Sequence, residues 1–215
     1  MTTANKITVT RIFMIPLFVM MAIYYGRGVA LGTPLEWQRW CAILIFLVAA
    51  ASDGLDGYIA RRFNQRSRLG VLLDPIADKG LLLAGIITLS LSEWRYELPI
   101  WFAVLVIARD VIVVAGVIAL QLLNGTVHVK PSWTGKVATV FQMLALSLAM
   151  LEREVSQFLT AAFSSGNATR LVFDIPVYLA GLFTAISGVI YILEGFRQLH
   201  AGAPTDPKTT THLRA

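Results

Sequence analysis

The chain has 215 residues, of which 56% are hydrophobic and only 14% charged, and its mean hydropathy is +0.68. This composition indicates an integral membrane protein and excludes an ordinary soluble domain. The net charge of +5 fits basic residues gathered in cytoplasmic loops, and no nucleic-acid-binding signature accompanies it, so we expect no nucleic acid as a partner. The single cysteine, Cys41, permits neither a disulfide within the chain nor a zinc cluster.

Six apolar runs follow one another along the chain, each bounded by charged residues, proline or glycine. They predict an all-α integral membrane protein whose single domain, residues 1–200, contains six transmembrane helices. A polar connection at 153–171 is compatible with a short interfacial helix, and residues 201–215 are expected to form a disordered cytoplasmic tail. The predicted spans are 11–31, 39–61, 74–92, 98–123, 134–152 and 172–196.

The placement of lysine and arginine predicts the orientation of these spans. With the N-terminus inside, the inner segments carry eleven basic residues and the outer segments five. The positive-inside rule therefore places both termini in the cytoplasm, and we expect a multi-pass protein of the cell inner (cytoplasmic) membrane. Four tryptophans lie near the predicted outer ends, as in an aromatic belt: Trp37, Trp40, Trp94 and Trp101.

Four aspartates stand at or near the inner ends of the second and third runs. Asp53 and Asp56 are three residues apart, and Asp74 and Asp78 are four apart, so each pair lies on one face of a helix. The short segment RRFNQRSR joins the two runs, so the helices are expected to be antiparallel neighbours whose acidic pairs can face each other. An aspartate deep in the membrane costs about 2.5–3.5 kcal/mol on insertion scales, and four together call for a function.

The binding of divalent cations would explain the four aspartates, because Mg²⁺ and Mn²⁺ prefer carboxylate oxygens. Four carboxylates are enough for two ions, and a two-metal site suits displacement at phosphorus. The alternative is that each aspartate caps a helix or pairs with Arg61 or Arg62, which leaves the helical spacing of the pairs unexplained. Small residues interleave with the acids, namely Gly54, Gly57, Ala60 and Gly70. They fit close helix packing, and they also leave room for a flat base or a phosphate against the backbone.

The stretch DGLDGYIARRFNQRSRLGVLLDPIAD, residues 53–78, resembles the signature of the CDP-alcohol phosphatidyltransferase family. In that signature D-x-x-D-G-x-x-A-R is followed, after eight residues, by G-x-x-x-D-x-x-x-D, and this chain fills all eight fixed positions. The resemblance implies that family's helical membrane fold. It also implies an enzyme that transfers a phosphatidyl group from a CDP-linked lipid to an alcohol and releases CMP.

The resemblance further implies roles for individual residues. The metal ligands for two ions, Mg²⁺ or Mn²⁺, are expected to be Asp53, Asp56, Asp74 and Asp78, and Asp78 is also expected to be the base that acts on the attacking hydroxyl. The CDP-binding positions are expected to be Gly57, Ala60, Arg61 and Gly70. Members of the family tend to be homodimers, so we expect a homodimer here, with an active site that faces the cytoplasm.

Other segments bear on the acceptor alcohol. NKITVTRIFMIPLF, ARDVIVVAG and VKPSWTGKVATVFQM resemble the phosphatidylglycerophosphate synthase branch, whose substrates are CDP-diacylglycerol and glycerol 3-phosphate. Arg109, Lys130 and Lys136 are candidate ligands of the acceptor phosphate, although Arg109 can pair with Asp110 and the lysines can simply set topology. Where that branch often has glutamate, this chain has Asp110, and with KPS…GK this also resembles the cardiolipin synthases of the family, whose acceptor is phosphatidylglycerol.

Three polar residues before the first span, Asn5, Thr8 and Arg11, can reach the nucleotide or the acceptor phosphate, or they can anchor an interfacial helix. Lys79 is expected to be a surface counter-charge. Two other functions are also compatible with membrane-bound acids. A prenyltransferase needs acidic motifs on well-separated helices, and a cation transporter needs ionisable residues at the midplane of several spans; the sequence offers little of either.

Overall fold

The computed structural model describes the chain over residues 3–63, 68–124, 133–163 and 166–200. Within these segments it describes the side chains of residues 8–52, 79–119, 122, 133–161 and 170–197. All regular secondary structure in this part of the chain is α-helical. The helices are α1 (Thr3–Ala30), α2 (Glu36–Phe63), α3 (Arg68–Leu91), α4 (Ile100–Asn124), α5 (Trp133–Met150), α6 (Glu152–Phe163) and α7 (Gly166–His200).

The predicted helices are confirmed, because α1 to α5 and α7 coincide with the six apolar runs of the sequence. The short helix expected in the polar connection is α6. Its first turn contains Glu152 and Glu154, and negative charge is favourable at the positive end of a helix. The predicted tail, residues 201–215, lies outside the described residues.

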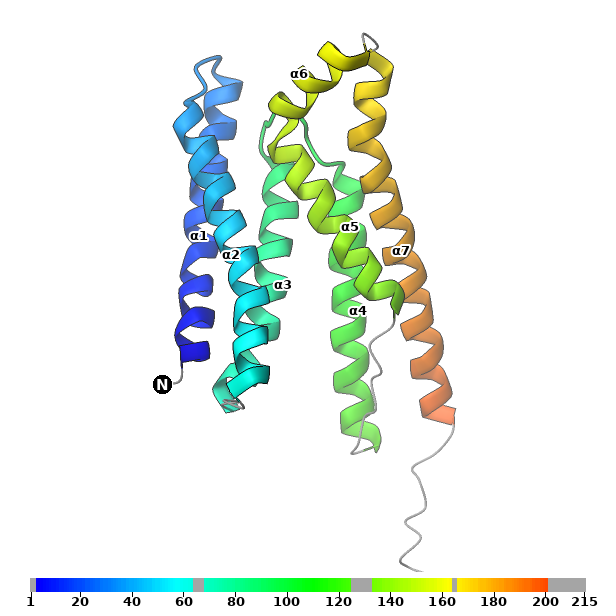
Figure 1. Cartoon of the computed structure of the whole chain (residues 1–215). Helices are drawn as coiled ribbons and strands as arrows, with labels where there is room; N and C mark the ends of the chain where they lie inside the picture. Colours follow the sequence, from blue (N-terminus) through cyan, green and yellow to red (C-terminus); the bar gives the residue numbers. More distant parts are fainter. Residues whose placement is uncertain (1–2, 64–67, 125–132, 164–165, 201–215) are drawn as a thin grey trace, which may run out of the picture.

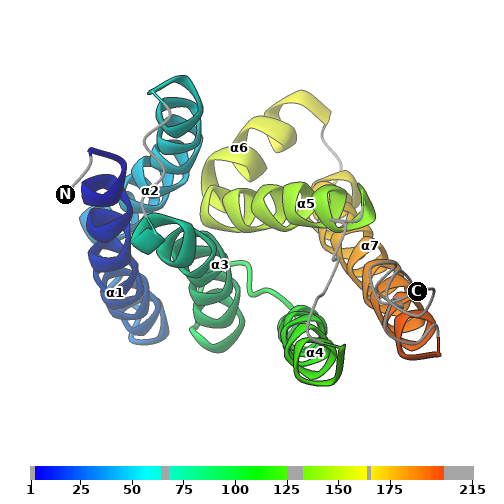
Figure 2. The same cartoon turned by 90° about the horizontal axis from the view of Figure 1, so that it is seen from below.

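The helices α1, α2, α3, α4 and α7 run roughly along the long axis of the molecule, α5 crosses it obliquely, and α6 lies across one end (Figure 1 and Figure 2). Seen along that axis, α1, α2 and α3 form one group, and α4, α5 and α7 form another (Figure 2). Within the groups α1 packs against α2 and α3, while α4 and α5 pack against α7. The groups approach closely at Gly85 of α3, where an added Cβ would lie 2.5 Å from Cδ2 of the buried Leu146 of α5.

The connection between α1 and α2 shows how the sequence ends a helix. Gly32 has a φ of 72°, a left-handed conformation that glycine adopts without steric cost. The N–H of Leu31 and the N–H of Thr33 donate to the carbonyls of Arg27 and Gly28, at 3.0 and 2.9 Å. These bonds satisfy carbonyls of the last helical turn, and the chain then reverses into α2.

Three helical segments of the described part are long and apolar enough to cross a membrane: Thr8–Ala30, Ile100–Ala119 and Arg170–Arg197. A fourth span results if α5 and α6, which are bent by 79° at Leu151, count as one broken span. In α3 the described segment Lys79–Leu91 is apolar but shorter. The protein is therefore a helical membrane protein with three to four such spans in the described part.

An ionic network holds α6 against the start of α2. Arg39, which is 3% exposed, donates from Nη1 to Oε2 of Glu154 at 2.9 Å and from Nη2 to its other oxygen. Arg153 donates to Oε1 of Glu36 at 2.5 Å, and Glu36 also lies 3.1 Å from Nε of Arg39. The alternating charges fix α6 across this end of the bundle.

Three of the four tryptophans expected in an aromatic belt, Trp37, Trp40 and Trp101, are exposed, as lipid-facing residues would be. The expectation is wrong for Trp94, which is 4% exposed. Its indole N–H donates to the carbonyl of Ala22 at 3.0 Å, so this tryptophan fastens the segment after α3 to α1 instead of facing lipid.

Candidate active site

The acidic motif lies on two helices that contact each other, α2 and α3. The backbone is helical at all four aspartates, so the expected spacing of each pair on one helix face is present. Only residues 64–67 separate the end of α2 from the start of α3, and the two helices run antiparallel at the end of the molecule where α4 also ends (Figure 1). The side chains of residues 53–78 lie outside the described ones.

The register of α2 and α3 brings the two acidic pairs to matching depths. Asp56 lies seven residues before the last residue of α2, and Asp74 six residues after the first residue of α3. At 1.5 Å per residue, both stand about 10 Å from the connection. Asp53 and Asp78 are each ten residues from it, about 15 Å. Antiparallel packing thus places Asp56 level with Asp74, and Asp53 level with Asp78.

This arrangement fits a pair of divalent cations. At each of two levels, one helical turn apart, the backbone places one aspartate of α2 and one of α3. Carboxylate oxygen is the donor that Mg²⁺ and Mn²⁺ prefer. Among the side chains that the structure describes, no group of three or more histidine, cysteine, aspartate or glutamate residues forms a metal site.

The expected CDP-binding positions lie on the same two helices. Gly57 and Ala60 follow Asp56 within about one turn of α2, Arg61 comes next, and Gly70 precedes Asp74 by four residues on α3. Small residues at these places let the helix backbones stand close to a ligand or to each other. The side chains of all four positions are outside the described residues, so their role stays a prediction.

A cluster of charged groups joins α3, α4 and α7 beside the motif. The carboxylate of Asp110 accepts hydrogen bonds from Nζ of Lys79, 3.1 Å from both oxygens, and from Nη1 of Arg109 at 2.6 Å. Arg109 also donates from Nη2 to Oγ of Ser187 at 2.9 Å and lies over the ring of Tyr191, 5.3 Å from its centroid. Two cations share one carboxylate here, so the cluster has a formal charge of +1.

Lys79 is therefore the counter-charge of Asp110, and it directly follows Asp78 on α3. Its side chain is 38% exposed, whereas those of Arg109 and Asp110 are 12% and 15% exposed. The three charged groups line a groove of about 470 Å³ between α3 and α4, whose other lining residues are apolar. The alternative considered for Arg109, pairing with its neighbour, is what the structure shows.

Of the two lysines expected to bind the acceptor phosphate, the structure describes the side chain of one, Lys136. Lys136 is exposed in the first turn of α5. Lys130 lies outside the described residues. The structure thus keeps Lys136 available to a ligand from solvent, and it leaves the grouping of Arg109, Lys130 and Lys136 as a prediction.

Arg11 is a buried charged residue of α1, for which the sequence left two alternatives open. Arg11 and Thr8 are each 1% exposed, and they continue the buried stripe of α1 that includes Phe18 and Ala22. An arginine is rarely buried to this degree unless polar groups surround it. One turn further along α1, Cδ1 of Ile15 would lie 3.1 Å from a Cβ added to Gly80 of α3. Arg11 is therefore close to the part of α3 that carries Asp78.

Comparison with known proteins identifies a family and several proteins to which this chain is similar. The model of the family described as CDP-alcohol phosphatidyltransferase matches residues 1–190. The chain belongs to this family. It is 38% identical over 143 residues to the CDP-diacylglycerol--glycerol-3-phosphate 3-phosphatidyltransferase of Escherichia coli (strain K12), which covers 66% of this chain and 72% of that protein. The proteins of the same name from Shigella flexneri and Shigella boydii are similar to the same extent.

The protein is thus a CDP-alcohol phosphatidyltransferase, a helical membrane enzyme of phospholipid biosynthesis, as the signature in residues 53–78 predicted. The family uses a divalent metal ion, which agrees with the carboxylate positions on α2 and α3. The sequence pairs Arg109 only with its neighbour Asp110 and does not predict that Lys79 also binds Asp110. The position of Asp110 inside an apolar run could have indicated this, since a carboxylate there needs cationic partners.

Proposed function

We propose that this enzyme transfers the phosphatidyl group of CDP-diacylglycerol to glycerol 3-phosphate, giving phosphatidylglycerophosphate and CMP. The observation that carries the proposal is the 38% identity to the Escherichia coli enzyme whose name states this reaction. The match extends through most of the chain, and it agrees with the segments outside the motif that resemble the same branch of the family.

The chemistry follows from the proposed roles of the aspartates. Asp78 takes the proton from the acceptor hydroxyl as its oxygen attacks the phosphorus that bears the diacylglycerol. A new P–O bond forms to the acceptor while the P–O bond to CMP breaks. Two Mg²⁺ or Mn²⁺ ions, held by Asp53, Asp56, Asp74 and Asp78, would neutralise the charge that develops on the leaving CMP.

Two groups of residues would bind the substrates. Gly57, Ala60, Arg61 and Gly70 would contact the cytidine diphosphate. The acceptor phosphate would be bound by Arg109, Lys130 and Lys136, and the formal +1 charge of the cluster formed by Lys79, Arg109 and Asp110 supports an anion nearby. Arg109 presents a planar set of donors that suits a phosphate, although part of it is already bound to Asp110.

The membrane arrangement that we propose has all six long helices crossing the bilayer of the cell inner membrane. The connection between α2 and α3 then lies in the cytoplasm, because the basic residues gather at that end. A charged motif near the interface would let α2 and α3 cross even though they are less apolar than α4. We also expect a homodimer, which the mass of the purified protein in detergent would test.

The roles of the aspartates are tested with Asp78→Asn. We expect this variant to lose CMP release by about 10²–10⁴-fold, because general-base catalysis contributes that much, while it still binds CDP-diacylglycerol. Asp174→Asn is the matched control, since Asp174 accepts a hydrogen bond from Tyr96, away from the motif, and should keep its turnover. Full activity of Asp78→Asn would remove Asp78 from the role of base.

The acceptor cations are tested through the KM for glycerol 3-phosphate. Lys130→Gln and Lys136→Gln should each raise this KM by about tenfold with little change in kcat, because one charge-assisted contact is worth about 1.5–3 kcal/mol. Arg197→Gln, which removes an exposed cation from the end of α7, is the control. A KM unchanged in both lysine variants would place the acceptor elsewhere.

Phosphatidylglycerol is the second candidate acceptor, because Asp110 and the KPS…GK pattern also resemble the cardiolipin synthases of the family. The lipid acceptor would have to reach the motif from the bilayer, whereas glycerol 3-phosphate arrives from water. The same purified enzyme offered each acceptor in turn distinguishes the two.

A further inference from the structure

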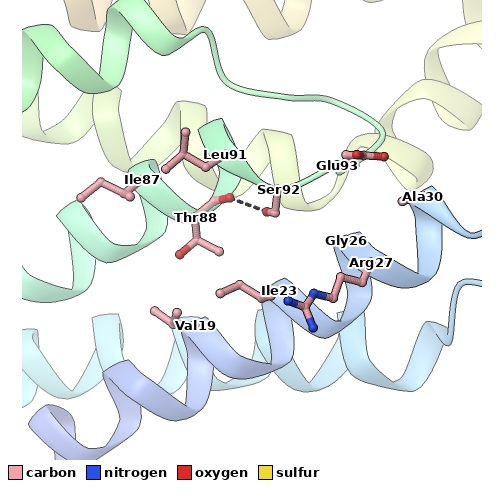
Figure 3. Close-up of a pocket in the computed structure, with 10 residues that line it drawn as sticks. All are labelled: Val19, Ile23, Gly26, Arg27, Ala30, Ile87, Thr88, Leu91, Ser92 and Glu93. Atoms are coloured by element: carbon pink, nitrogen blue, oxygen red, sulfur yellow. Dashed lines mark hydrogen bonds between the residues drawn. The ribbon is translucent and has the colours of Figure 1, made fainter.

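A second polar site lies at the opposite end of the bundle from the α2–α3 connection. There a hollow of about 400 Å³ opens between the last turns of α1 and the end of α3. Figure 3 shows its two walls, with Val19, Ile23 and Arg27 on α1 facing the residues of α3 across the space. The other lining residues are Gly26, Ala30, Ile87, Thr88, Leu91, Ser92 and Glu93.

The hollow changes from apolar to charged along its length. Val19, Ile23 and Ile87 line the part nearer the middle of the helices, and Arg27 and Glu93 line the part at their ends. Val19 and Arg27 are eight residues apart on α1, which is about 12 Å. A phospholipid has the same gradient, because its acyl chains lie in the hydrocarbon layer and its charged headgroup at the interface.

Arg27 and Glu93 are the charged groups of this site, and neither contributes to the fold through a polar contact with another described side chain. Both side chains are exposed. Neither forms an ion pair or a side-chain hydrogen bond with any residue that the structure describes. Arg27 is in the last turn of α1, where a cation is favourable, but that effect requires no hollow and no carboxylate across from it.

The floor of the hollow is closely packed. A Cβ added to Gly26 would lie 3.1 Å from Cβ of Ser92 and 3.3 Å from the backbone N of Glu93. Beside it the indole of Trp94 donates to the carbonyl of Ala22 at 3.0 Å and packs edge-on against Tyr25, with 4.8 Å between ring centroids. The segment that carries Glu93 is thus fixed against the helix that carries Arg27, so the site exists before a ligand arrives.

We propose that this hollow binds one phospholipid whose headgroup carries both a phosphate and a primary ammonium. Its phosphate accepts hydrogen bonds from the Arg27 guanidinium, which is suited to phosphate oxygens. Its ammonium donates to the carboxylate of Glu93, and its acyl chains lie along Val19, Ile23 and Ile87. An anionic headgroup without an ammonium leaves Glu93 facing like charge. The site is separate from the catalytic motif and does not depend on the proposed reaction.

Native mass spectrometry of the purified full-length protein tests the proposal. The protein would be offered equal amounts of phosphatidylethanolamine and phosphatidylglycerol of the same acyl chains. We expect a preference for the ethanolamine lipid that Glu93→Gln reduces by about tenfold, because this variant removes the contact to the ammonium. Arg27→Ala should lower the binding of both lipids by about tenfold, because both carry the phosphate that Arg27 would bind. The matched controls are Arg95→Ala and Glu97→Gln, exposed residues of the same connection that do not line the hollow, and they should keep the preference.

Three results would overturn the proposal. A preference for phosphatidylglycerol that depends on Arg27 and increases in Glu93→Gln would show a site for anionic lipid. Equal binding of both lipids, unchanged in all four variants, would show only the ordinary lipid layer around the helices. Loss of the preference in the control variants as well would trace it to the charge of the whole connection. CMP release should be unchanged in Arg27→Ala, which shows that the variant is folded and separates this test from that of the catalytic site.

Discussion

Among the described side chains, Asp110 is the carboxylate that pairs with both Lys79 and Arg109, so Asp110→Asn should destabilise the protein. Arg109 and Asp110 have side chains that are 12% and 15% exposed. Removing one partner of a buried pair costs about 3–5 kcal/mol because the other charge stays buried. We expect the lower end, about 3 kcal/mol, since Arg109 keeps its hydrogen bond to Ser187 and its position over Tyr191.

The contribution of Lys79 should be smaller. Its side chain is 38% exposed, so water screens the pair and a coupling of about 0.5–1 kcal/mol with Asp110 is expected. A double-mutant cycle with Lys79→Met and Asp110→Asn measures this coupling directly. The double variant should therefore be slightly more stable than the sum of the two single losses predicts, because it no longer leaves two uncompensated cations side by side.

Thermal unfolding in detergent is the assay. For a chain of this size 1 kcal/mol corresponds to about 2–4 °C, so Asp110→Asn should lower Tm by about 6–12 °C. Glu97→Gln removes an exposed carboxylate and should leave Tm within about 1 °C. If Asp110→Asn unfolds at the temperature of the wild type, the cluster does not hold α3, α4 and α7 together, and the argument from burial is wrong.

Two further predictions concern packing and pH. Gly85→Ala should destabilise the protein by about 1 kcal/mol, because its Cβ would lie 2.5 Å from Leu146 and overpacking outweighs the better helix propensity of alanine. Gly116→Ala is the control: a Cβ there meets nothing within 4 Å, so this variant should be as stable as the wild type or more stable. Equal changes of Tm in both variants would refute the close contact at Gly85. Burial raises the pKa of Tyr96, and its hydrogen bond to Asp174 raises it further. The stability that this tyrosine contributes is complete below about pH 10 and is lost as pH rises beyond it, so Tyr96→Phe should remove part of the alkaline fall in Tm, and identical Tm–pH curves would contradict this.

The sequence predicted the helices of this protein well because lipid-facing helices must be long and apolar. α1, α4 and α7 follow from hydropathy alone, and α6 from the polarity of the connection that contains Glu152 and Glu154. The acidic motif was found because its spacing matches two helix turns and a family signature. The sequence did not show that Asp53 lies level with Asp78 and Asp56 level with Asp74. That register depends on where α2 ends and α3 begins, which hydropathy does not define.

Contacts between helices could not be predicted in the same way. Lys79 and Asp110 are 31 residues apart, and Arg39 and Glu154 are 115 residues apart. No local pattern relates such pairs, because they depend on which faces of the helices meet. The same reason explains Trp94, which looked like an interfacial residue by its position in the chain but is buried against Ala22.

The most direct test of the central claim is CMP release by the purified full-length protein in detergent with CDP-diacylglycerol and Mg²⁺ or Mn²⁺. We predict release when glycerol 3-phosphate is added, none when a metal chelator is added, and none with phosphatidylglycerol in its place. Release only with phosphatidylglycerol would assign the enzyme to cardiolipin synthesis and would require another role for Arg109, Lys130 and Lys136. Release that continues without any divalent cation would contradict the proposal that the four aspartates hold metal ions.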